Sequence, residues 1–516
     1  MTKLTKDNLF VLVKSLTKSE KRQFKLYVGR LGVNEDSKFL LLFKLLERLK
    51  VYDEKLILKQ GFVKKQQLSN LKAHLYKQIL ISLKLNPSHQ NLRIQLREQL
   101  DFATILYHKG LYKQSLKILD KAKALAIKNQ EKNIAYEIVE LEKVIESQYI
   151  TRSLSNRADA LTIQAKELSR QNVIASKLSN LSLQLYGLFL KTGYVKNNAE
   201  HEKVTDYFDK RMPKFKIEAL GFREKLWLYK SHLWYSFLIQ DFKSCYKYSR
   251  KWVDLFYDNE TMIPLNPVFF LRGYQYLLEA LFFIKHHQKF KNVLNDFEQI
   301  TQKAWFPHDD NIDGLVFLYL YSNKINLHFM EGSFNEGLPL IEEVLEGLKR
   351  HANQIDEHHV MVFYYKIASL YFGTGDYENA IYFLSKIINN KSLQMREDLL
   401  CFSRILNLVA HYEAGIDYQL DRLIKNTYKF LIKMEDLYAV QKEMVSFLKS
   451  LGDIYPNELK AAFRGLHQKL LTYEDHPYER RAFLYLDIIS WLESKIENKS
   501  TADIIKEKFT KININI

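Results

Sequence analysis

Glycine and proline are scarce in this chain of 516 residues, which contains 17 glycines and 8 prolines. An average protein carries roughly 7% glycine and 5% proline, and a β-sandwich or an α/β enzyme of this length needs many turn residues. The scarcity argues against both classes. With 47% hydrophobic and 27% charged residues, the composition favours long amphipathic helices joined by short turns, and thus an all-α fold.

Cysteines and long apolar runs are also few. The two cysteines, Cys245 and Cys401, lie far apart in the sequence, which excludes a disulfide framework and a cysteine-based zinc finger. No stretch approaches the ~18 uncharged apolar residues of a membrane-spanning helix, so we expect no membrane association. The apolar run at residues 9–13 is too short for a signal sequence. The expected location is the cytoplasm.

The motifs of the common enzyme classes are missing. The sequence contains no phosphate-binding P-loop, no dinucleotide-binding glycine motif, no His-Glu-x-x-His zinc motif and no nucleophile elbow. Each motif supplies a geometry that its chemistry requires. We therefore expect that the protein is not an enzyme, and that it has no catalytic residues and no cofactor.

Two partial matches to metal sites have simpler explanations. Residues 309–314 carry the oxygen ligands and the glycine of a calcium loop, but Leu320 stands where the loop needs a glutamate. We expect a polar turn here, with Asp313 as the helix cap. The histidine pairs at 286–287 and 358–359 cannot chelate alone, because neighbouring residues on a helix point about 100° apart. The sequence predicts no metal site.

Positive charge is concentrated at the start of the chain. The net charge is +17, and residues 1–85 hold 19 Lys and Arg against 7 Asp and Glu, so +12 falls in this stretch. Apolar residues recur there at helical spacing, Thr17 and Glu20 form a capping box that begins a helix, and Pro87 stops the last one. The sequence predicts a separate basic bundle of about five helices over residues 1–87.

A repeated pattern begins after this bundle. Its clearest copy spans residues 361–394, where small and aromatic residues surround a glycine turn: Tyr364, Ala368, Tyr371, Gly375, Tyr377 and Ala380. Small residues let two antiparallel helices approach closely, and glycine can take the left-handed conformation that ends a helix. The pattern resembles the tetratricopeptide repeat, although Leu384 stands where that family has an aromatic residue.

Weaker copies place the same turn at a regular spacing, at Gly110, Gln240, Gln288, Gly332 and Gly375. The last four positions are 48, 44 and 43 residues apart, and the first gap of 130 fits three such steps, with a degenerate unit near Gly193. A regular tetratricopeptide unit has roughly 34 residues, so these helix pairs are longer. The resemblance implies a right-handed superhelix of helix pairs over residues 91–455. We expect capping helices over residues 456–516.

In tetratricopeptide-like proteins the first helices of the pairs line a concave groove that holds a partner. On those helices we expect aromatic anchors and amides able to bond a peptide backbone, namely Trp227, Trp234, Phe237, Asn323 and Asn326. Packing of the aromatic rings between repeats is the alternative explanation.

The basic bundle offers candidate contacts for a polyanion. On the capped helix four cations share the face opposite Phe24, Val28 and Leu31, namely Lys18, Lys21, Arg22 and Lys25. The turn at Gly61 is followed by a helix that carries Lys64, Lys65 and Lys72 beside glutamines, which is the outline of a helix-turn-helix. A solvated basic surface without a partner is the alternative.

These observations favour a non-enzymatic adaptor or scaffold that presents a helical-repeat groove to a protein or peptide. A regulator is the second hypothesis. Its basic amino-terminal bundle would bind nucleic acid or the ribosome, and its repeats would sense a ligand.

Overall fold

The computed structural model describes residues 7–30, 37–148, 156–390, 397–415, 417–433, 439–450, 454–455, 457–479, 483 and 487–514. Within these ranges the chain forms α-helices and short 3-10 segments and no strand, which confirms the all-α prediction. Contacts divide the chain into two compact units, residues 1–166 and 167–516. The three segments predicted from the sequence are a finer division and stay a prediction.

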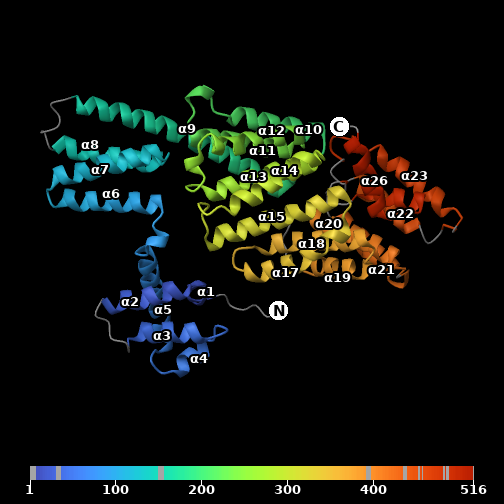
Figure 1. Cartoon of the computed structure of the whole chain (residues 1–516), viewed down its shortest axis with the longest axis horizontal. Helices are drawn as coiled ribbons and strands as arrows, with labels where there is room; N and C mark the ends of the chain where they lie inside the picture. The colour runs from blue at the N-terminus through green and yellow to red at the C-terminus, as the bar shows by residue number, and fades with distance from the viewer. Residues whose placement is uncertain are drawn as a thin grey trace. The chain divides into compact units, whose positions relative to one another are not determined.

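Unit 1 begins with a small bundle whose helices pack mainly on the last of them, α5. Their bounds are α1 Asn8–Ser15, α2 Lys18–Arg30, α3 Lys38–Arg48, α4 Glu54–Lys59 and α5 Lys65–Lys84 (Figure 1). The capping box is confirmed: the Glu20 amide donates to Thr17 Oγ1 over 3.2 Å, and the Thr17 amide donates to Glu20 Oε2 over 2.7 Å. Phe24 and Val28 of α2 are buried against the other helices, whereas Leu31 lies outside the described residues.

The rest of unit 1 holds a 3-10 turn and longer helices, of which α6 packs on α7 and α7 on α8. Their bounds are η1 Pro87–His89, α6 Leu92–His108, α7 Tyr112–Lys128, α8 Lys132–Gln148 and α9 Arg157–Thr192, which crosses into unit 2. Charged residues are buried between α7 and α8. The Lys123 ammonium lies 2.5 Å from Glu142 Oε2, and the side chains are 9% and 0% exposed. Arg157 approaches the other oxygen of Glu142 at 3.1 Å.

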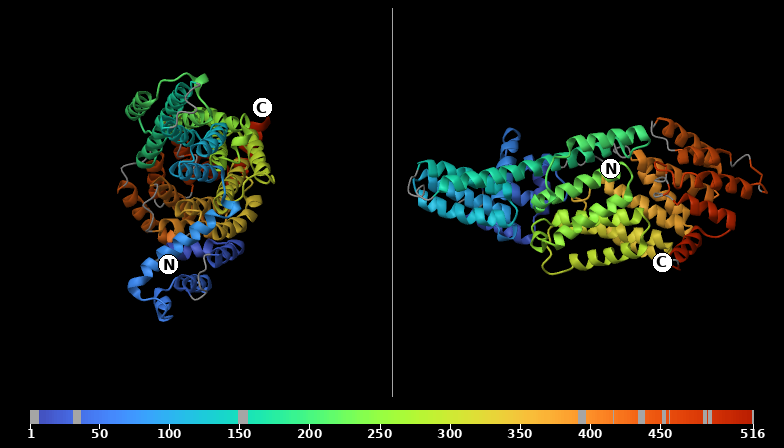
Figure 2. Two further views of the ribbon diagram at one scale, coloured as in Figure 1. Left: turned by 90° about the vertical axis from the view of Figure 1, so that its left-hand side faces the viewer. Right: turned by 90° about the horizontal axis from the view of Figure 1, so that it is seen from above.

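Unit 2 continues the arrangement in successive helix pairs (Figures 1 and 2). The first helices of neighbouring pairs also contact one another: α13 contacts α15, α15 contacts α18, and α18 contacts α20. This packing is what a helical-repeat array produces. The helices and 3-10 turns are α10 Asn198–Arg211, η3 Ile217–Ala219, α11 Phe222–Leu238, α12 Phe242–Tyr257, η4 Glu260–Met262, α13 Pro267–Phe283, α14 His287–Thr301, α15 Asp310–Glu331, α16 Phe334–Gly337, α17 Pro339–Arg350, α18 Glu357–Thr374, α19 Tyr377–Ile388, α20 Glu397–Glu413, α21 Asp417–Lys433, α22 Ala439–Ser450, α23 Leu459–Leu471, α25 Ile488–Glu497 and α26 Thr501–Ile514.

The turns inside the pairs share one geometry. A residue with positive φ ends the first helix of a pair at Gly110, Gln240, Lys285, Gly332 and Gly375, and Gln130 ends α7 before α8 in the same way. In each case the next amide donates to the carbonyl five residues before it, as Asp376 does to Tyr371 O over 2.9 Å. This is the Schellman bond, which satisfies a carbonyl that the helix end leaves free. The recurrence supports a repeated unit more strongly than any side-chain pattern does.

One predicted turn was misplaced. Gln288 lies inside α14, and the left-handed residue is Lys285, three positions earlier. With this correction the last turns are 45, 47 and 43 residues apart. The predicted cap at Asp313 is also wrong. Asp309 caps α15 by accepting the Ile312 amide, while Asp313 hydrogen-bonds His308.

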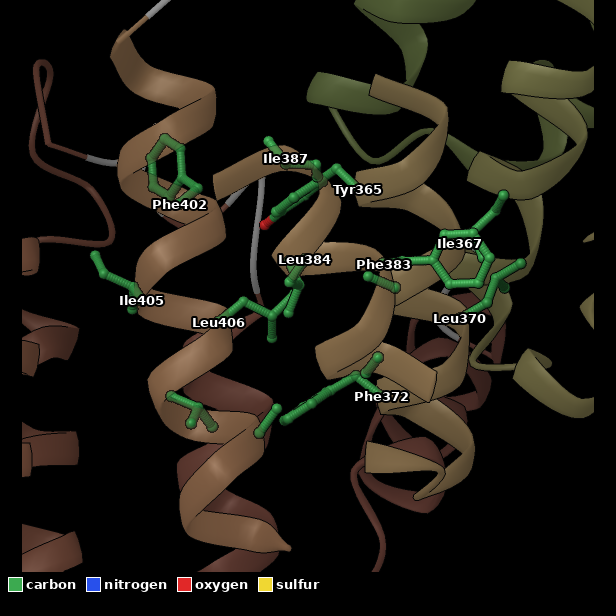
Figure 3. Close-up of a cluster of buried hydrophobic side chains, with 14 of the residues drawn as sticks. Tyr365, Ile367, Leu370, Phe372, Phe383, Leu384, Ile387, Phe402, Ile405 and Leu406 are labelled. Carbon is green, nitrogen blue, oxygen red and sulfur yellow. The ribbon is translucent and has the colours of Figure 1, made fainter. Parts of the chain in front are cut away.

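The core of unit 2 includes the best-defined repeat, as Figure 3 shows for α18, α19 and α20. Ala368 and Ala380 are fully buried between these helices. Gly373 has no room for a side chain, because a Cβ there would lie 2.3 Å from the Phe334 ring. Close approach therefore depends on small residues, as the pattern predicted. Within the described residues, no helix combines the length and apolarity needed to cross a bilayer.

Candidate functional site

A cavity of about 280 Å³ lies in unit 2 among the first helices of successive pairs. We call it the aromatic cavity. It is lined by aromatic rings from α9, the turn after it, α11, α13, α15 and α18, namely Tyr186, Phe189, Tyr194, Trp234, Phe237, Tyr276, Tyr319 and Phe363. Tyr186 and Leu190 are 38% and 54% exposed, so they mark its solvent side.

Trp234 forms one wall of the aromatic cavity. Its ring is 6% exposed and lies 4.7 Å from Tyr186, 5.3 Å from Phe189 and 5.7 Å from Tyr276, measured between ring centroids. Its indole nitrogen has no hydrogen-bond partner within the described residues. The ring packs between consecutive helices, as the alternative explanation held, and it also borders the cavity. Phe237 is 2% exposed and, like Trp234, is buried among the helices and borders the cavity.

The two predicted asparagines are not among the residues that line this cavity. They belong to a hydrogen-bonded chain that joins three helices. The Asn323 amide nitrogen of α15 donates to Gln275 Oε1 of α13 over 2.8 Å. Asn326 donates to Asn323 Oδ1 over 3.3 Å, and Lys366 of α18 donates to Asn326 Oδ1. Because Asn323 is fully buried and these amides bond within the protein, they hold the helices in register. The amide that lines the cavity is Gln275.

Trp227 is not brought to the aromatic cavity. It lies in a separate small cluster, where its ring packs on Phe269 at 5.5 Å and carries the Lys230 ammonium 4.9 Å from its centroid. Burial, and then the charge of Arg272, lower the pKa of Lys230 to about 8. The predicted pair of tryptophans is therefore split between two sites.

Sequence reasoning missed several residues at the cavity. Lys366 lies behind the lining, where its ammonium donates to the carbonyl of Ser322 over 3.3 Å; burial lowers its pKa to about 7, and Glu279 opposes that shift. Tyr319 lines the cavity and has a raised pKa, mainly because of burial. A signal was present, since Trp234, Tyr276, Tyr319 and Phe363 follow one another at steps of 42, 43 and 44 residues.

Comparison with protein-family models, with curated proteins and with solved structures finds no match, so similarity assigns the cavity no role. The chemistry of the site must therefore be argued from its own residues. Among the described residues no group of three or more metal-binding side chains comes together.

The predicted basic residues form a second candidate site in unit 1. Lys18, Lys21, Arg22 and Lys25 of α2 line an open hollow of about 560 Å³ together with Leu26 and Glu47. We call it the basic hollow. Lys21 and Lys25 lie 3.8 and 3.2 Å from Glu47, so one carboxylate faces both cations. The basic hollow keeps a net positive charge.

The other predicted cations lie apart from the basic hollow. Lys64 and Lys65 are exposed at the start of α5. Lys72 forms an ion pair with Asp7 and donates to the Tyr52 hydroxyl over 3.1 Å. Because its charge is already matched inside the bundle, Lys72 is a weak candidate for contact with a polyanion.

Proposed function

We propose that the protein is a non-enzymatic adaptor whose unit 2 binds a peptide, or an extended segment of another protein, at the aromatic cavity. The observation that carries this proposal is a cavity walled by aromatic rings from successive repeats and partly open to solvent. Its volume is close to the lower end of ligand pockets, roughly 300 Å³. That is enough for one large side chain of a partner.

The surroundings of the aromatic cavity suit recognition of a peptide. Aromatic residues that fill desolvated pockets dominate the energy of protein interfaces. Gln275, Ser322 and Glu279 add polar groups to the lining, and such groups fix the orientation of a bound chain. We extend the proposal to the architecture: the helix pairs form a tetratricopeptide-like superhelix, and its concave side holds the partner.

Filling the aromatic cavity tests the proposal. Ser322 lines it and is partly exposed, and its hydroxyl forms no hydrogen bond with any residue in the described ranges. A Ser322→Trp protein should lose at least about tenfold in affinity for peptides selected on the wild-type protein from a displayed random library, because the indole occupies the space of the anchor. Binding would be measured by fluorescence polarisation.

The matched control is Asn295→Trp, which places the same side chain on the exposed face of α14. It should bind the selected peptides as the wild type does. Equal affinity in all three proteins would contradict the assignment of the cavity.

A second function is favoured by the exposure of the basic hollow. Lys18, Arg22 and Lys25 are exposed, and burial together with the charge of Lys21 lowers the pKa of Lys14 nearby. We propose that this surface binds a polyanion such as nucleic acid. Affinity should then fall with salt at a log–log slope of about −0.9 per phosphate contact with duplex DNA.

Reversal of the charges tests this second function. Replacing Lys18, Lys21, Arg22 and Lys25 with Glu should remove three to four phosphate contacts. The log–log slope of affinity against salt should then become shallower by roughly 2.7–3.6. Phe24 and Val28 remain packed, so helicity measured by circular dichroism should not change. An unchanged slope for binding to duplex DNA and to RNA would contradict the polyanion hypothesis and leave the peptide hypothesis untouched.

A further inference from the structure

A second cavity in unit 2, of about 210 Å³, lies where the turn ends of three helix pairs meet the carboxyl-terminal helices. We call it the C-terminal cavity. Its apolar wall is built from residues far apart in sequence, among them Phe282, Phe329, Phe334, Phe372 and Phe509. None of these residues lines the aromatic cavity.

Helix α26 is a fixed wall of this cavity. The helix contacts α15, α18 and α25. At its first turn it lies so close to Gly332 that a Cβ there would be 2.9 Å from the Ala502 carbonyl oxygen and 3.0 Å from the Lys506 nitrogen. Phe509 packs edge-on against His287 at 4.5 Å. Glycine at position 332 is therefore needed both for the left-handed backbone of the turn and for the close packing of α26 against it.

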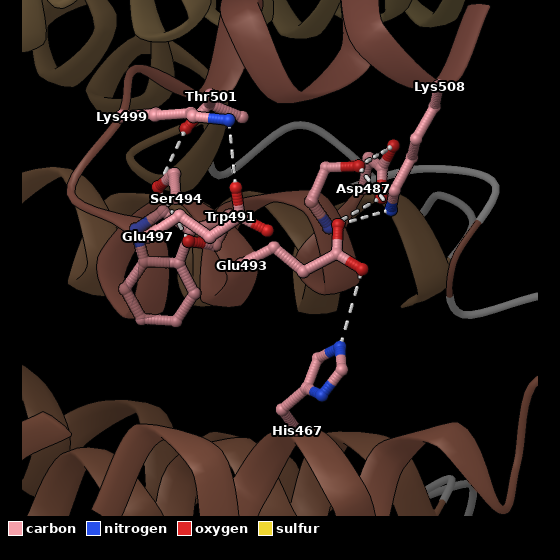
Figure 4. A network of polar contacts seen from close by, with 10 residues as sticks. His467, Asp487, Trp491, Glu493, Ser494, Glu497, Lys499, Thr501 and Lys508 are labelled. Atoms are coloured by element: carbon pink, nitrogen blue, oxygen red, sulfur yellow. Dashed lines mark hydrogen bonds and ion pairs between the residues drawn. The ribbon is translucent and has the colours of Figure 1, made fainter. Parts of the chain in front are cut away.

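Most charged groups on the wall of the C-terminal cavity already have partners. Figure 4 shows two of these groups, Asp487 and Lys508, with their contacts. Lys508 lies 2.5 Å from Glu493 and donates to Ser490. The Asp487 carboxylate accepts the amide and the hydroxyl of Ser490. His287 faces Glu331 at 2.8 Å.

Lys285 is the exception. Its side chain is exposed, and within the described part of the chain it makes no ion pair or side-chain hydrogen bond that would match its charge. It sits at the left-handed turn position, with φ of 54°, which fixes its backbone at the mouth of the cavity. An apolar cavity with one unmatched cation at its edge suits a ligand that has an apolar body and an anionic group.

We propose that the C-terminal cavity binds a small molecule with an apolar body about the size of one aromatic ring and a single anionic group. An engineered apolar cavity of about 150 Å³ takes up benzene, so 210 Å³ accommodates a ring and a short side chain. The ring packs against the phenylalanine side chains, and the anion pairs with Lys285. The bound molecule then joins α26 to the turns of the repeats.

Two probes of the same shape and different charge test the proposal by calorimetry on the full-length protein. 3-Phenylpropionate carries the anion, and 3-phenylpropan-1-ol replaces it with a neutral hydroxyl. The acid should bind about tenfold more tightly than the alcohol, since a hydrogen bond to a charged group adds roughly 1.5 kcal/mol or more. Equal affinities, or no saturable binding of either probe at millimolar concentration, would overturn the proposal.

Two variants and one mapping experiment locate the site. Lys285→Gln should remove the difference between the probes, and Gln is suited to that position because Gln130 and Gln240 occupy equivalent left-handed turns. Met330→Trp fills the cavity and should abolish binding of both probes.

Hydrogen exchange of the wild type locates the site even if Met330→Trp does not fold: 3-phenylpropionate should slow exchange in residues 501–514. Protection confined to other helices, or a preference for the acid that survives in Lys285→Gln, would refute the site.

Discussion

Replacing Lys123 with methionine should destabilise unit 1 by about 3–5 kcal/mol at neutral pH. Removing one partner of a buried ion pair leaves the other charge without compensation, and Glu142 is fully buried. Methionine keeps an unbranched apolar chain out to the ε position and lacks only the ammonium, so the loss comes mainly from charge. Arg157, 3.1 Å from Glu142, offsets part of it and places the expected value toward the lower end of the range.

The loss should depend on pH. Burial raises the pKa of Glu142 above its ordinary value, and Lys123 opposes that shift. The folded protein therefore retains a proton at Glu142 to higher pH than the unfolded chain does, and this group makes folding less favourable as pH rises through that range. Without Lys123 the pKa rises further. The difference in the free energy of unfolding between variant and wild type should therefore be small near pH 5 and larger at pH 7.5.

Hydrogen exchange of residues 112–148 during urea titration measures this effect locally. All five tryptophans lie between residues 227 and 491, so tryptophan fluorescence reports on unit 2 and should not change. The control is Lys143→Met, which breaks an exposed pair with Glu140 and should cost less than about 1 kcal/mol. An equal loss at both pH values, or a loss no larger than that of Lys143→Met, would contradict the buried pair.

Replacing Trp234 with alanine should destabilise unit 2 by about 3–5 kcal/mol, the usual cost of truncating a buried aromatic residue. The ring touches four other aromatic rings, and alanine would leave a void between helices. Trp234→Phe should cost much less, because it keeps a ring and removes an indole N–H that has no acceptor among the described residues.

The midpoint of urea unfolding, followed by the fluorescence of the remaining tryptophans, measures this difference. Trp305 is 50% exposed, so Trp305→Ala is the matched control and should shift the midpoint little. If Trp234→Ala shifts it no further than Trp305→Ala, the ring is not a packing element. Loss of binding in Trp234→Ala would be ambiguous, which is why the test of the aromatic cavity uses Ser322.

Local features of the fold could be predicted from the sequence because they depend on few neighbouring residues. The turn at Gly375 was predicted from a glycine that follows a helical pattern, and its left-handed conformation is confirmed. The capping box of Thr17 and Glu20 involves residues three apart and is equally local. Lys285 was missed because a lysine at a left-handed position gives no compositional signal, whereas glycine does.

The candidate sites were harder to predict, because their contacts join distant segments. Asn326 and Lys366 are 40 residues apart and meet only when α15 packs on α18. Lys123 and Glu142 look in the sequence like any surface charges, and only the packing of α7 on α8 buries them. The sequence placed both asparagines on the first helix of a pair, as the structure has them, but it could not show that their amides bond to each other.

Hydrogen-exchange mapping of a bound peptide tests the central claim most directly. A peptide selected on the wild-type protein would be added at saturating concentration, and exchange would be followed along the whole chain. The aromatic cavity predicts slower exchange in α11, α13, α15 and α18, and no such protection in Ser322→Trp. Protection confined to residues 7–84, or protection of the same four helices that persists in Ser322→Trp, would contradict it.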